Sequence, residues 1–333
     1  MTAPIPAEWS PHRALWVGWP SHGELWEDNL EPAQAEVEAL MRALAGRGRE
    51  QVRLMVGNEE ALADARARFD GVAGVEVVAG RFGDIWLRDT GPIFGAGSTT
   101  AQAFRFNGWG GKYDLPHDDE VADQIGARAG VPLTRHDVVL EGGALDHDGA
   151  GTVLTTRQCL LNPNRNPGWT QEAAEAALAE AVGARKVIWL GDGLLNDHTD
   201  GHVDNLARFV APGVVACPVA WGRKDPNAEV YDATARDLAA ATDADGRPLK
   251  VLRIPSPGLV LDEDERPVPA SHMNFLIANG AVIVPSYGDE TAARLACEAL
   301  ATVYPDREII ALPSIAILTG GGSFHCISQQ EPA

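Results

Sequence analysis

The sequence predicts a protein of mixed α/β class, folded as one continuous domain over residues 1–333. Short β-type runs alternate with helical runs along the whole chain, and no linker, low-complexity tract or sharp change of composition divides it. A unit of strands plus one helix also recurs about every sixty residues. Periodicity alone fixes no closer topology than this class.

Helices are predicted where apolar side chains recur at helical spacing. They cover residues 31–49, 58–69, 118–129, 170–182, 227–241 and 289–303. Asn58 and Thr170 are the expected N-caps, because their side-chain oxygens can accept a hydrogen bond from a free N–H of the first helical turn. Strands are predicted where apolar runs stand between polar or glycine-rich segments. They cover residues 52–57, 75–78, 84–88, 100–106, 138–140, 186–190, 251–254, 280–284 and 308–312, with a hairpin at 144–156.

The composition is ordinary for a soluble globular protein, with 45% hydrophobic and 22% charged residues. The four cysteines lie far apart and form no Cys-x-x-Cys pair, so neither a disulfide framework nor a zinc knuckle is expected. The first residues lack the basic and apolar regions of a signal peptide, and no apolar stretch approaches the ~20 residues of a membrane helix. We therefore expect a cytoplasmic protein without membrane contact.

The formal net charge is −20, which argues against nucleic acid as a partner, since phosphate binding needs a cationic face. The charge suits a cationic small substrate, whose encounter rate an acidic surface raises. Solubility alone also accounts for it, so the charge excludes more than it identifies.

Polar and glycine residues gather in five segments flanked by apolar strands. These segments are residues 86–92, 106–112, 140–143, 197–204 and 320–326. Because sites concentrate in loops held by a rigid scaffold, we expect these strand ends to face one cleft.

Cys326 is the first candidate for chemistry, because the preceding glycines Gly320 to Gly322 permit close approach of backbone to a ligand. The alternative is a small core residue, which a lone cysteine more often is. A thiol has a pKa of about 8.5 in water. A nucleophilic Cys326 therefore needs activation by a neighbouring histidine or by a cationic substrate.

The segment 197–204 is rich in ligand-type side chains. In an extended strand, four of them share one face, since side chains alternate with period two: His198, Asp200, His202 and Asp204. Such a face suits acid–base catalysis or a zinc ion, which binds histidine nitrogen and carboxylate oxygen. Against zinc, Gly201 interrupts the strand, and one strand does not easily wrap four ligands around one ion. A polar strand facing solvent is the third interpretation.

Carboxylates elsewhere in the chain suit a planar guanidinium, which they hold through bidentate hydrogen bonds. Asp89 and Glu141 join Asp204 in this set. Each is weak alone, because Asp89 can pair with Arg88 and Glu141 can be a solvated strand end. Trp86 is a candidate to stack on such a cation, although aromatic residues are more often core.

Five motifs in order resemble those of the agmatine deiminases of bacteria and plants, which are related to the Porphyromonas-type peptidyl-arginine deiminases. The motifs are residues 6–12, 86–92, 160–167, 199–205 and 320–330. One such motif is weak, but five in the right order are specific, and the resemblance runs nearly end to end.

The resemblance implies a pentein fold, a five-bladed α/β propeller with pseudo-fivefold symmetry and a site in its central channel. It implies hydrolytic deimination of agmatine to N-carbamoylputrescine and ammonia, a reaction of agmatine degradation and putrescine biosynthesis. It also implies no cofactor, a small cationic guanidine as the binding partner, and a homo-oligomer, either a dimer or a tetramer.

The resemblance also implies a role for each site residue. Cys326 is the nucleophile that forms a covalent thiouronium intermediate, and His202 is the general acid and base. Glu141 is similar to the glutamate that hydrogen-bonds the catalytic histidine and the substrate. No metal belongs to the site.

The substrate contacts follow from the same resemblance. Asp89 and Asp204 hold the guanidinium, and Trp86 lines the pocket. The chain departs from the family pattern at Ser323-Phe324 and at His272-Met273, which are expected near the pocket wall.

Other interpretations remain. A deiminase of arginine or peptidyl-arginine needs a cation for the substrate carboxylate or its equivalent, and Arg105 and Lys112 are the candidates. An amidinotransferase uses the same cysteine and histidine but passes the amidino group to an amine. A metallohydrolase is built on the segment 197–204. A non-catalytic binding protein of this fold lacks the cysteine, histidine and acid set, which this chain has.

Overall fold

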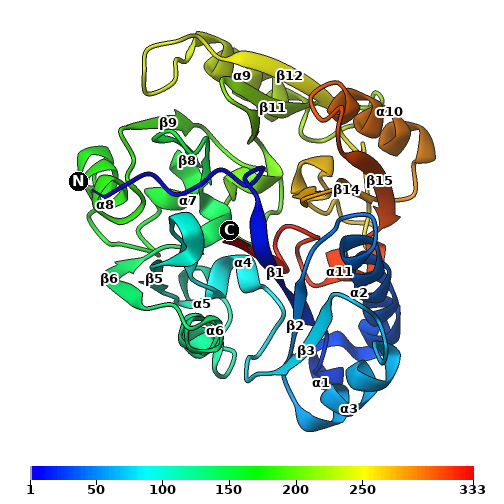
Figure 1. Cartoon of the computed structure of the whole chain (residues 1–333). Helices are drawn as coiled ribbons and strands as arrows, with labels where there is room; N and C mark the ends of the chain where they lie inside the picture. Colours follow the sequence, from blue (N-terminus) through cyan, green and yellow to red (C-terminus); the bar gives the residue numbers. More distant parts are fainter. Residues whose placement is uncertain (1) are drawn as a thin grey trace.

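The computed structural model describes residues 2–333, and within them sixteen strands form five small sheets arranged in a ring (Figure 1). Each sheet contains one antiparallel pair followed by one parallel pair, and the four-stranded sheet adds a second parallel pair, β2 with β3. A helix connects the parallel strands, and the longer helices lie on the rim of the ring (Figure 1). The predicted α/β class and the five-bladed propeller are therefore confirmed.

The first blade joins the two ends of the chain. Its strands, in sheet order, are β16 (Ser328–Pro332), β1 (His12–Trp19), β2 (Val52–Val56) and β3 (Val75–Ala79). Its helices are α1 (Gly23–Trp26), η1 (Glu27–Asn29), α2 (Leu30–Ala45) and α3 (Glu59–Arg68). Because β16 pairs antiparallel with β1, the C-terminal strand closes the ring and places Cys326, two residues before it, at the centre.

The second and third blades follow the chain order. The second has β4 (Ile93–Phe94), β5 (Ala101–Arg105) and β6 (Leu133–Val139), with α4 (Leu87–Thr90), η2 (Ala96–Ser98), α5 (Gly108–Gly111), η3 (Asp118–Glu120) and α6 (Val121–Ala129). The third has β7 (Asp146–His147), β8 (Thr152–Thr156) and β9 (Lys186–Leu190), with η4 (Gly142–Ala144), α7 (Arg157–Leu160) and α8 (Gln171–Val182).

The fourth and fifth blades repeat the pattern. The fourth has β10 (Arg208–Ala211), β11 (Val214–Val219) and β12 (Lys250–Pro255), with η5 (Val203–Asn205) and α9 (Ala228–Ala240). The fifth has β13 (Leu276–Ile277), β14 (Ala281–Ser286) and β15 (Glu308–Pro313), with η6 (His272–Asn274), α10 (Glu290–Ala301) and α11 (Ile315–Thr319). The equivalent strands β5, β8, β11 and β14 begin at residues 101, 152, 214 and 281, which confirms the predicted recurrence.

Most of the predicted elements are present, and the two predicted caps are confirmed. The Asn58 side chain accepts a hydrogen bond from the N–H of Ala61, and the Thr170 side chain accepts one from Ala173. The strand predicted at 84–88 is wrong, because a helical turn, α4, begins at Leu87 there. No helix within residues 2–333 is long and apolar enough to cross a membrane.

Candidate active site

One turn from each blade reaches the centre of the ring. Four of these turns are α4, η4, η5 and η6, which pack against one another in that order and each precede the first strand of a blade. The fifth turn directly precedes β16. They carry, in chain order, Asp89, Glu141 with Gly143, Asp204, Asn274 and Cys326. The pseudo-fivefold repeat therefore brings together side chains that are spread over most of the chain.

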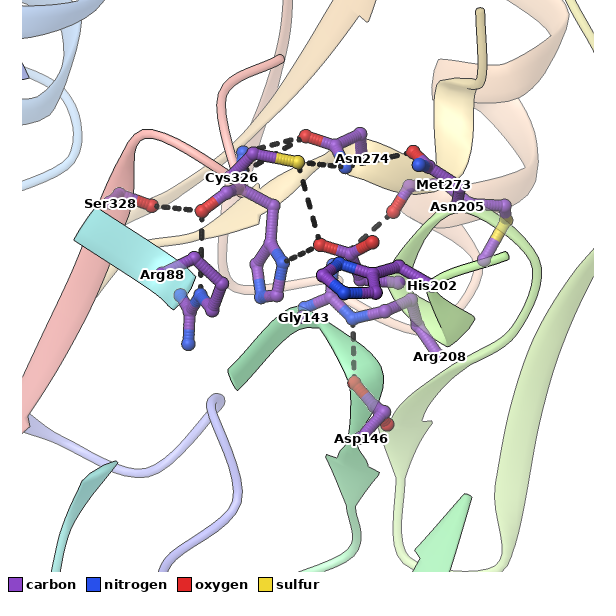
Figure 2. Close-up of polar contacts among 12 residues, drawn as sticks. Arg88, Gly143, Asp146, His202, Asn205, Arg208, Met273, Asn274, Cys326 and Ser328 are labelled. Atoms are coloured by element: carbon purple, nitrogen blue, oxygen red, sulfur yellow. Dashed lines mark hydrogen bonds and ion pairs between the residues drawn. The ribbon is translucent and has the colours of Figure 1, made fainter. Parts of the chain in front are cut away.

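Cys326 is buried at a cavity of about 270 Å³. Its Sγ lies 3.1 Å from Nδ2 of Asn274 and 3.6 Å from Oδ2 of Asp204. Figure 2 shows the sulfur of Cys326 beside the Asn274 amide. Burial raises the pKa of the Cys326 thiol well above its usual range, and the negative charges of Asp204 and Asp89 raise it further. Without a bound cation, the thiol is therefore neutral at physiological pH.

Asn274 fixes the position of Cys326. Its Oδ1 accepts hydrogen bonds from the backbone N–H groups of His325, at 3.0 Å, and Cys326, at 3.3 Å. Its Nδ2 contacts the thiol and also donates to Oδ1 of Asn205 at 2.9 Å. One buried amide thus holds both the backbone and the sulfur of Cys326.

The glycine triplet before Cys326 stands where side chains would not fit. A Cβ atom at Gly322 would lie 2.6 Å from the Trp86 ring and 3.1 Å from the sulfur of Cys326. Gly321 has φ of 107°, a conformation that residues with side chains rarely adopt. The triplet lets the backbone run between the tryptophan and the thiol without filling the cavity.

The segment 197–204 is not an extended strand. Asp200 has φ of 64° and Gly201 has φ of 90°, so the chain reverses between His198 and His202. The predicted shared face of four ligand-type side chains is therefore wrong. The hydroxyl of Tyr113 bonds Nδ1 of His198 at 2.7 Å near the cavity opening, whereas His202 is buried in the centre.

His202 lies between acidic groups. Its Nδ1 is 3.7 Å from Oδ1 of Asp89, and within the described chain neither ring nitrogen has a hydrogen-bond partner. Burial lowers the pKa of this imidazole, but the charge of Asp89, helped by Cys159 and Glu141, outweighs burial and holds the pKa well above its usual range. The ring is therefore an imidazolium whose N–H groups are free to donate.

Asp89 is the carboxylate on the side of His202. Its Oδ1 accepts the N–H of Gly143 at 2.9 Å, and its Oδ2 accepts the indole N–H of Trp109 at 2.9 Å. Burial raises the pKa of Asp89, and the negative charges of Asp204 and Glu141 add to this, while His202 opposes it. Arg88, a possible partner in the sequence, instead bonds Gln329 and Gln330.

The charged groups around Asp204 differ from those around Asp89. Its Oδ2 lies 2.8 Å from Nδ1 of His325, and within residues 2–333 its buried Oδ1 has no partner. Burial raises the pKa of Asp204, but the hydrogen bond and charge of His325, together with His202 and Arg208, outweigh burial and lower it. Asp204 is held ionised, with one oxygen free.

Glu141 is tied to Arg165. Nε of Arg165 donates to Oε1 of Glu141 at 2.6 Å, and Arg165 also pairs with Asp200 at 2.6 Å. The buried Oε2 of Glu141 has no partner among the described residues. Ligand atoms of Glu141, Cys159 and His202 lie within 4.8 Å of one another, so Glu141 reaches the surroundings of His202.

Aromatic side chains form much of the cavity wall. Trp86 and Trp26 line it with ring centroids 6.3 Å apart, and both indoles donate to Asp84, at 2.6 and 3.0 Å. Trp109 and Tyr113 form the facing part, with ring centroids 5.7 Å apart. Trp86, which the resemblance places in a substrate pocket, lines this cavity.

The charged groups that line the cavity are acidic. Glu27, Asp84 and Asp89 contribute carboxylates, and no Arg or Lys of residues 2–333 belongs to the lining. The two cations proposed from the sequence are engaged elsewhere, since Arg105 pairs with Asp137 and Lys112 pairs with Asp200. A larger depression of about 950 Å³ between Trp221 and Glu290 has neither cysteine nor histidine in its lining.

Sequence reasoning missed several residues that organise the centre. Asn274, Arg165, His325 and Glu8 are each buried and each contact a predicted site residue or its neighbour. None of the four was singled out, because no local pattern shows which polar residues are buried at the centre of the ring. The departures at Ser323 and Met273 are buried and do not line the cavity.

The fold defines the class of protein first. The solved structure of DDAH from Pseudomonas aeruginosa, complexed with citrulline, superposes with a TM-score of 0.54 over 96% of this chain and 99% of that chain. At 13% identity this likeness concerns the fold alone. It supports the pentein architecture that the five blades display.

The family follows from closer relatives. The family model of the Porphyromonas-type peptidyl-arginine deiminases matches residues 4–332. The agmatine deiminase of Stutzerimonas stutzeri (strain A1501) is 40% identical over 99% of this chain and 95% of its own length. The solved agmatine deiminase of Enterococcus faecalis is 35% identical, with a TM-score of 0.92 over 99% of this chain and 95% of that chain. The chain belongs to the Porphyromonas-type peptidyl-arginine deiminase family.

Proposed function

We propose that this chain is an enzyme that hydrolyses agmatine to N-carbamoylputrescine and ammonia, with Cys326 as the nucleophile. The observation that carries the proposal is a buried thiol at the floor of a cavity whose charged lining groups are carboxylates. The relatives named agmatine deiminase support the same reaction.

The guanidinium binds first, between Asp89 and Asp204. The free Oδ1 of Asp204 accepts one N–H, and Asp89 accepts others from the opposite side. The positive charge of the substrate then compensates the two carboxylates that raise the pKa of the thiol. Because the bound positive charge lowers the pKa of the thiol, Cys326 loses its proton to solvent. It is then a thiolate next to its electrophile.

The thiolate adds to the central guanidinium carbon and forms a tetrahedral adduct. His202, which is protonated in the free enzyme, gives its proton to the departing nitrogen, and ammonia leaves. The substrate remains bound to sulfur as an S-alkylthiouronium. Glu141 and Asp89 keep His202 in place through the charge they present to it.

Water completes the reaction. Neutral His202 removes one proton from a water molecule, and the resulting hydroxide adds to the thiouronium carbon. The sulfur leaves as thiolate, and the hydroxyl proton is released to solvent as the C=O bond forms, where the ammonia takes up a proton. Cys326 regains its proton from solvent when the ureido product leaves. The sum is one guanidinium and one water converted to one ureido group and one ammonium ion. One histidine serves as acid in the first half and base in the second.

The cavity opening supports a substrate with a cationic tail. Glu27 lines the cavity, is exposed, and has φ of 47° and ψ of −127°, a strained conformation for a residue with a side chain. Its carboxylate suits the terminal ammonium of agmatine. Free arginine would bring a carboxylate to the same acidic opening, where no lining Arg or Lys of residues 2–333 receives it.

The experiment that tests this function compares ammonia release from agmatine, arginine and a peptidyl-arginine by the wild-type protein and Cys326→Ala. We expect turnover of agmatine far above the other two, and none by Cys326→Ala. Turnover of arginine above agmatine would refute the substrate assignment. An active Cys326→Ala that keeps the wild-type fold would refute the mechanism.

Three further properties are part of the proposal. We propose that residues 1–333 form a single catalytic domain, for which one cooperative unfolding transition is expected. A homo-oligomer, dimer or tetramer, stays a prediction that sedimentation analysis decides. A cytoplasmic location stays a prediction that cell fractionation decides.

A further inference from the structure

A buried chain of charged groups runs behind Asp204 to the N-terminal segment. Glu8 precedes β1 and is buried, although 317 positions separate it from His325. Its Oε2 lies 3.2 Å from Nε2 of His325 and also pairs with Arg208, and its Oε1 accepts the N–H of Ile277 at 2.8 Å. Glu8 neither lines the cavity nor bonds Cys326. Its carboxylate is engaged by His325, Arg208 and the N–H of Ile277, so any influence on the reaction passes through these neighbours.

His325 lies between two carboxylates. Its Nε2 faces Glu8, and its Nδ1 faces Oδ2 of Asp204 at 2.8 Å. An ionised carboxylate accepts hydrogen bonds and donates none, so His325 satisfies both neighbours only by carrying a proton on each ring nitrogen. The geometry therefore makes His325 an imidazolium shared by Glu8 and Asp204.

The position of Asp204 depends on that shared imidazolium. His325 occupies Oδ2, which leaves Oδ1, buried and without a partner among residues 2–333, for the substrate. The positive charge of His325 also keeps the pKa of Asp204 low against the cost of burial. A neutral or rotated His325 would lose both effects at once.

We propose that Glu8 is a positioning residue for the reaction, which acts through His325 to hold Asp204 ionised and turned toward the guanidinium. The proposal rests on the proposed function, since it needs a guanidinium at Asp204. Glu8 touches neither the substrate nor the nucleophile.

A purely structural role for Glu8 is less complete as an explanation. Arg208 already donates to Asp146 at 2.6 Å and to the carbonyl oxygen of Met273 (Figure 2). It also donates to the carbonyl oxygen of Phe275, so Glu8 is not its sole acceptor. The contact with Ile277 needs only a neutral acceptor. The negative charge of Glu8 serves two contacts, one with Arg208 and one with His325. Of these two partners, only His325 is hydrogen-bonded to Asp204.

The main variant is Glu8→Gln, which keeps the size and the acceptor for Ile277 but removes the charge. We expect kcat/KM to fall about 10- to 100-fold, mainly through KM, as for other residues that orient a ligand-binding group. Glu8→Asp keeps the charge and is expected to recover most of the loss. The thermal midpoint of each variant checks that the fold is retained.

The matched control is Glu50→Gln. Glu50 is also a buried glutamate beside a histidine, with Oε1 3.1 Å from Nδ1 of His12 and 2.7 Å from the N–H of Asn279. It has no contact with His325 or Asp204 among its hydrogen bonds. We expect kcat/KM of Glu50→Gln to stay within about threefold of wild type.

A double-mutant cycle tests whether Glu8 acts through His325. His325→Asn keeps a donor group but loses the charge, and we expect the same fall in kcat/KM. The double variant should lose little more than either single variant, because one path is broken twice. Additive losses would overturn the proposal.

The remaining outcomes are also decisive. A folded Glu8→Gln with kcat/KM within about threefold of an active wild type overturns this proposal alone and leaves the proposed function intact. A wild-type protein that releases no ammonia from any guanidine overturns both. If Glu8→Gln does not fold, His325→Asn decides, because wild-type kcat/KM in that variant contradicts the proposal.

Discussion

The two carboxylates proposed to hold the guanidinium lie in opposite surroundings. Asp204 faces His325, and the surrounding cations lower its pKa despite complete burial. Asp89 accepts hydrogen bonds from neutral donors, Gly143 and Trp109. His202 lies 3.7 Å away and lowers the pKa of Asp89, but burial and the neighbouring carboxylates leave that pKa raised. The difference teaches that the protein's own cations hold Asp204 ionised, whereas in the proposed mechanism the cationic substrate favours the ionised form of Asp89.

The largest effect is expected when the carboxylate of Asp204 is removed. Asp204→Asn leaves the cations His325 and Arg208 facing the guanidinium without their carboxylate, so we expect kcat/KM to fall about a thousandfold or more. Asp89→Asn removes a carboxylate with weaker support and is expected to cost about a hundredfold. Steady-state kinetics with circular dichroism as the folding control measures both. A larger loss in Asp89→Asn would reverse the comparison.

The pH dependence sharpens the same contrast. Binding needs ionised Asp89, whose pKa is raised by burial, so kcat/KM should fall as pH decreases through a value above the usual carboxyl range. Asp204, with a lowered pKa, stays ionised over that interval. A pH profile of kcat/KM checks this, and the acid limb should move in Asp89→Asn. An acid limb in the ordinary carboxyl range would contradict the role given to Asp89.

A smaller effect is expected at the cavity opening. Glu27→Gln removes an exposed carboxylate from the proposed ammonium site, so KM for agmatine should rise about fivefold while kcat is unchanged. An alkylguanidine without the terminal ammonium is the matched control, and its KM should not change. Equal changes in KM for both compounds would show that Glu27 does not bind the terminal ammonium of agmatine.

The smallest effect concerns stability outside the reacting centre. Asp118 accepts the N–H groups of Gly83 and Asp84, and burial raises its pKa to about 7. Its folded-state pKa exceeds the unfolded value, so the folded state binds the extra proton and loses stability as pH rises through that interval. The thermal unfolding midpoint of Asp118→Asn minus that of wild type should therefore increase as pH rises from about 5 to about 8. A constant difference in thermal midpoint would contradict the raised pKa.

Much of the fold was predictable because it repeats. The recurrence of about sixty residues corresponds to one blade, and the polar segments 86–92, 140–143, 197–204 and 320–326 supply the central turns. The resemblance then selected Cys326 and His202 from those segments. Local patterns sufficed here because four of the five blades are built from residues that lie close together in the sequence.

The remaining features depend on contacts that no local pattern encodes. The segment 197–204 alternates like a strand, but Asp200 adopts a left-handed conformation and turns His202 away from His198. Likewise, Glu8 and His325 meet only because β16 returns to pair with β1. Buried polar pairs of this kind form only in the folded ring, so the sequence alone does not predict them.

The central claim is that Cys326 forms a covalent thiouronium with the substrate. Wild-type protein is mixed with agmatine, quenched in acid within one turnover, digested and analysed by mass spectrometry. The account predicts that the peptide with Cys326 gains the mass of agmatine less one ammonia, and that Cys159 stays unmodified. An adduct of the bare amidino group would indicate transfer to an amine instead, and product formation without any adduct on Cys326 would contradict the account.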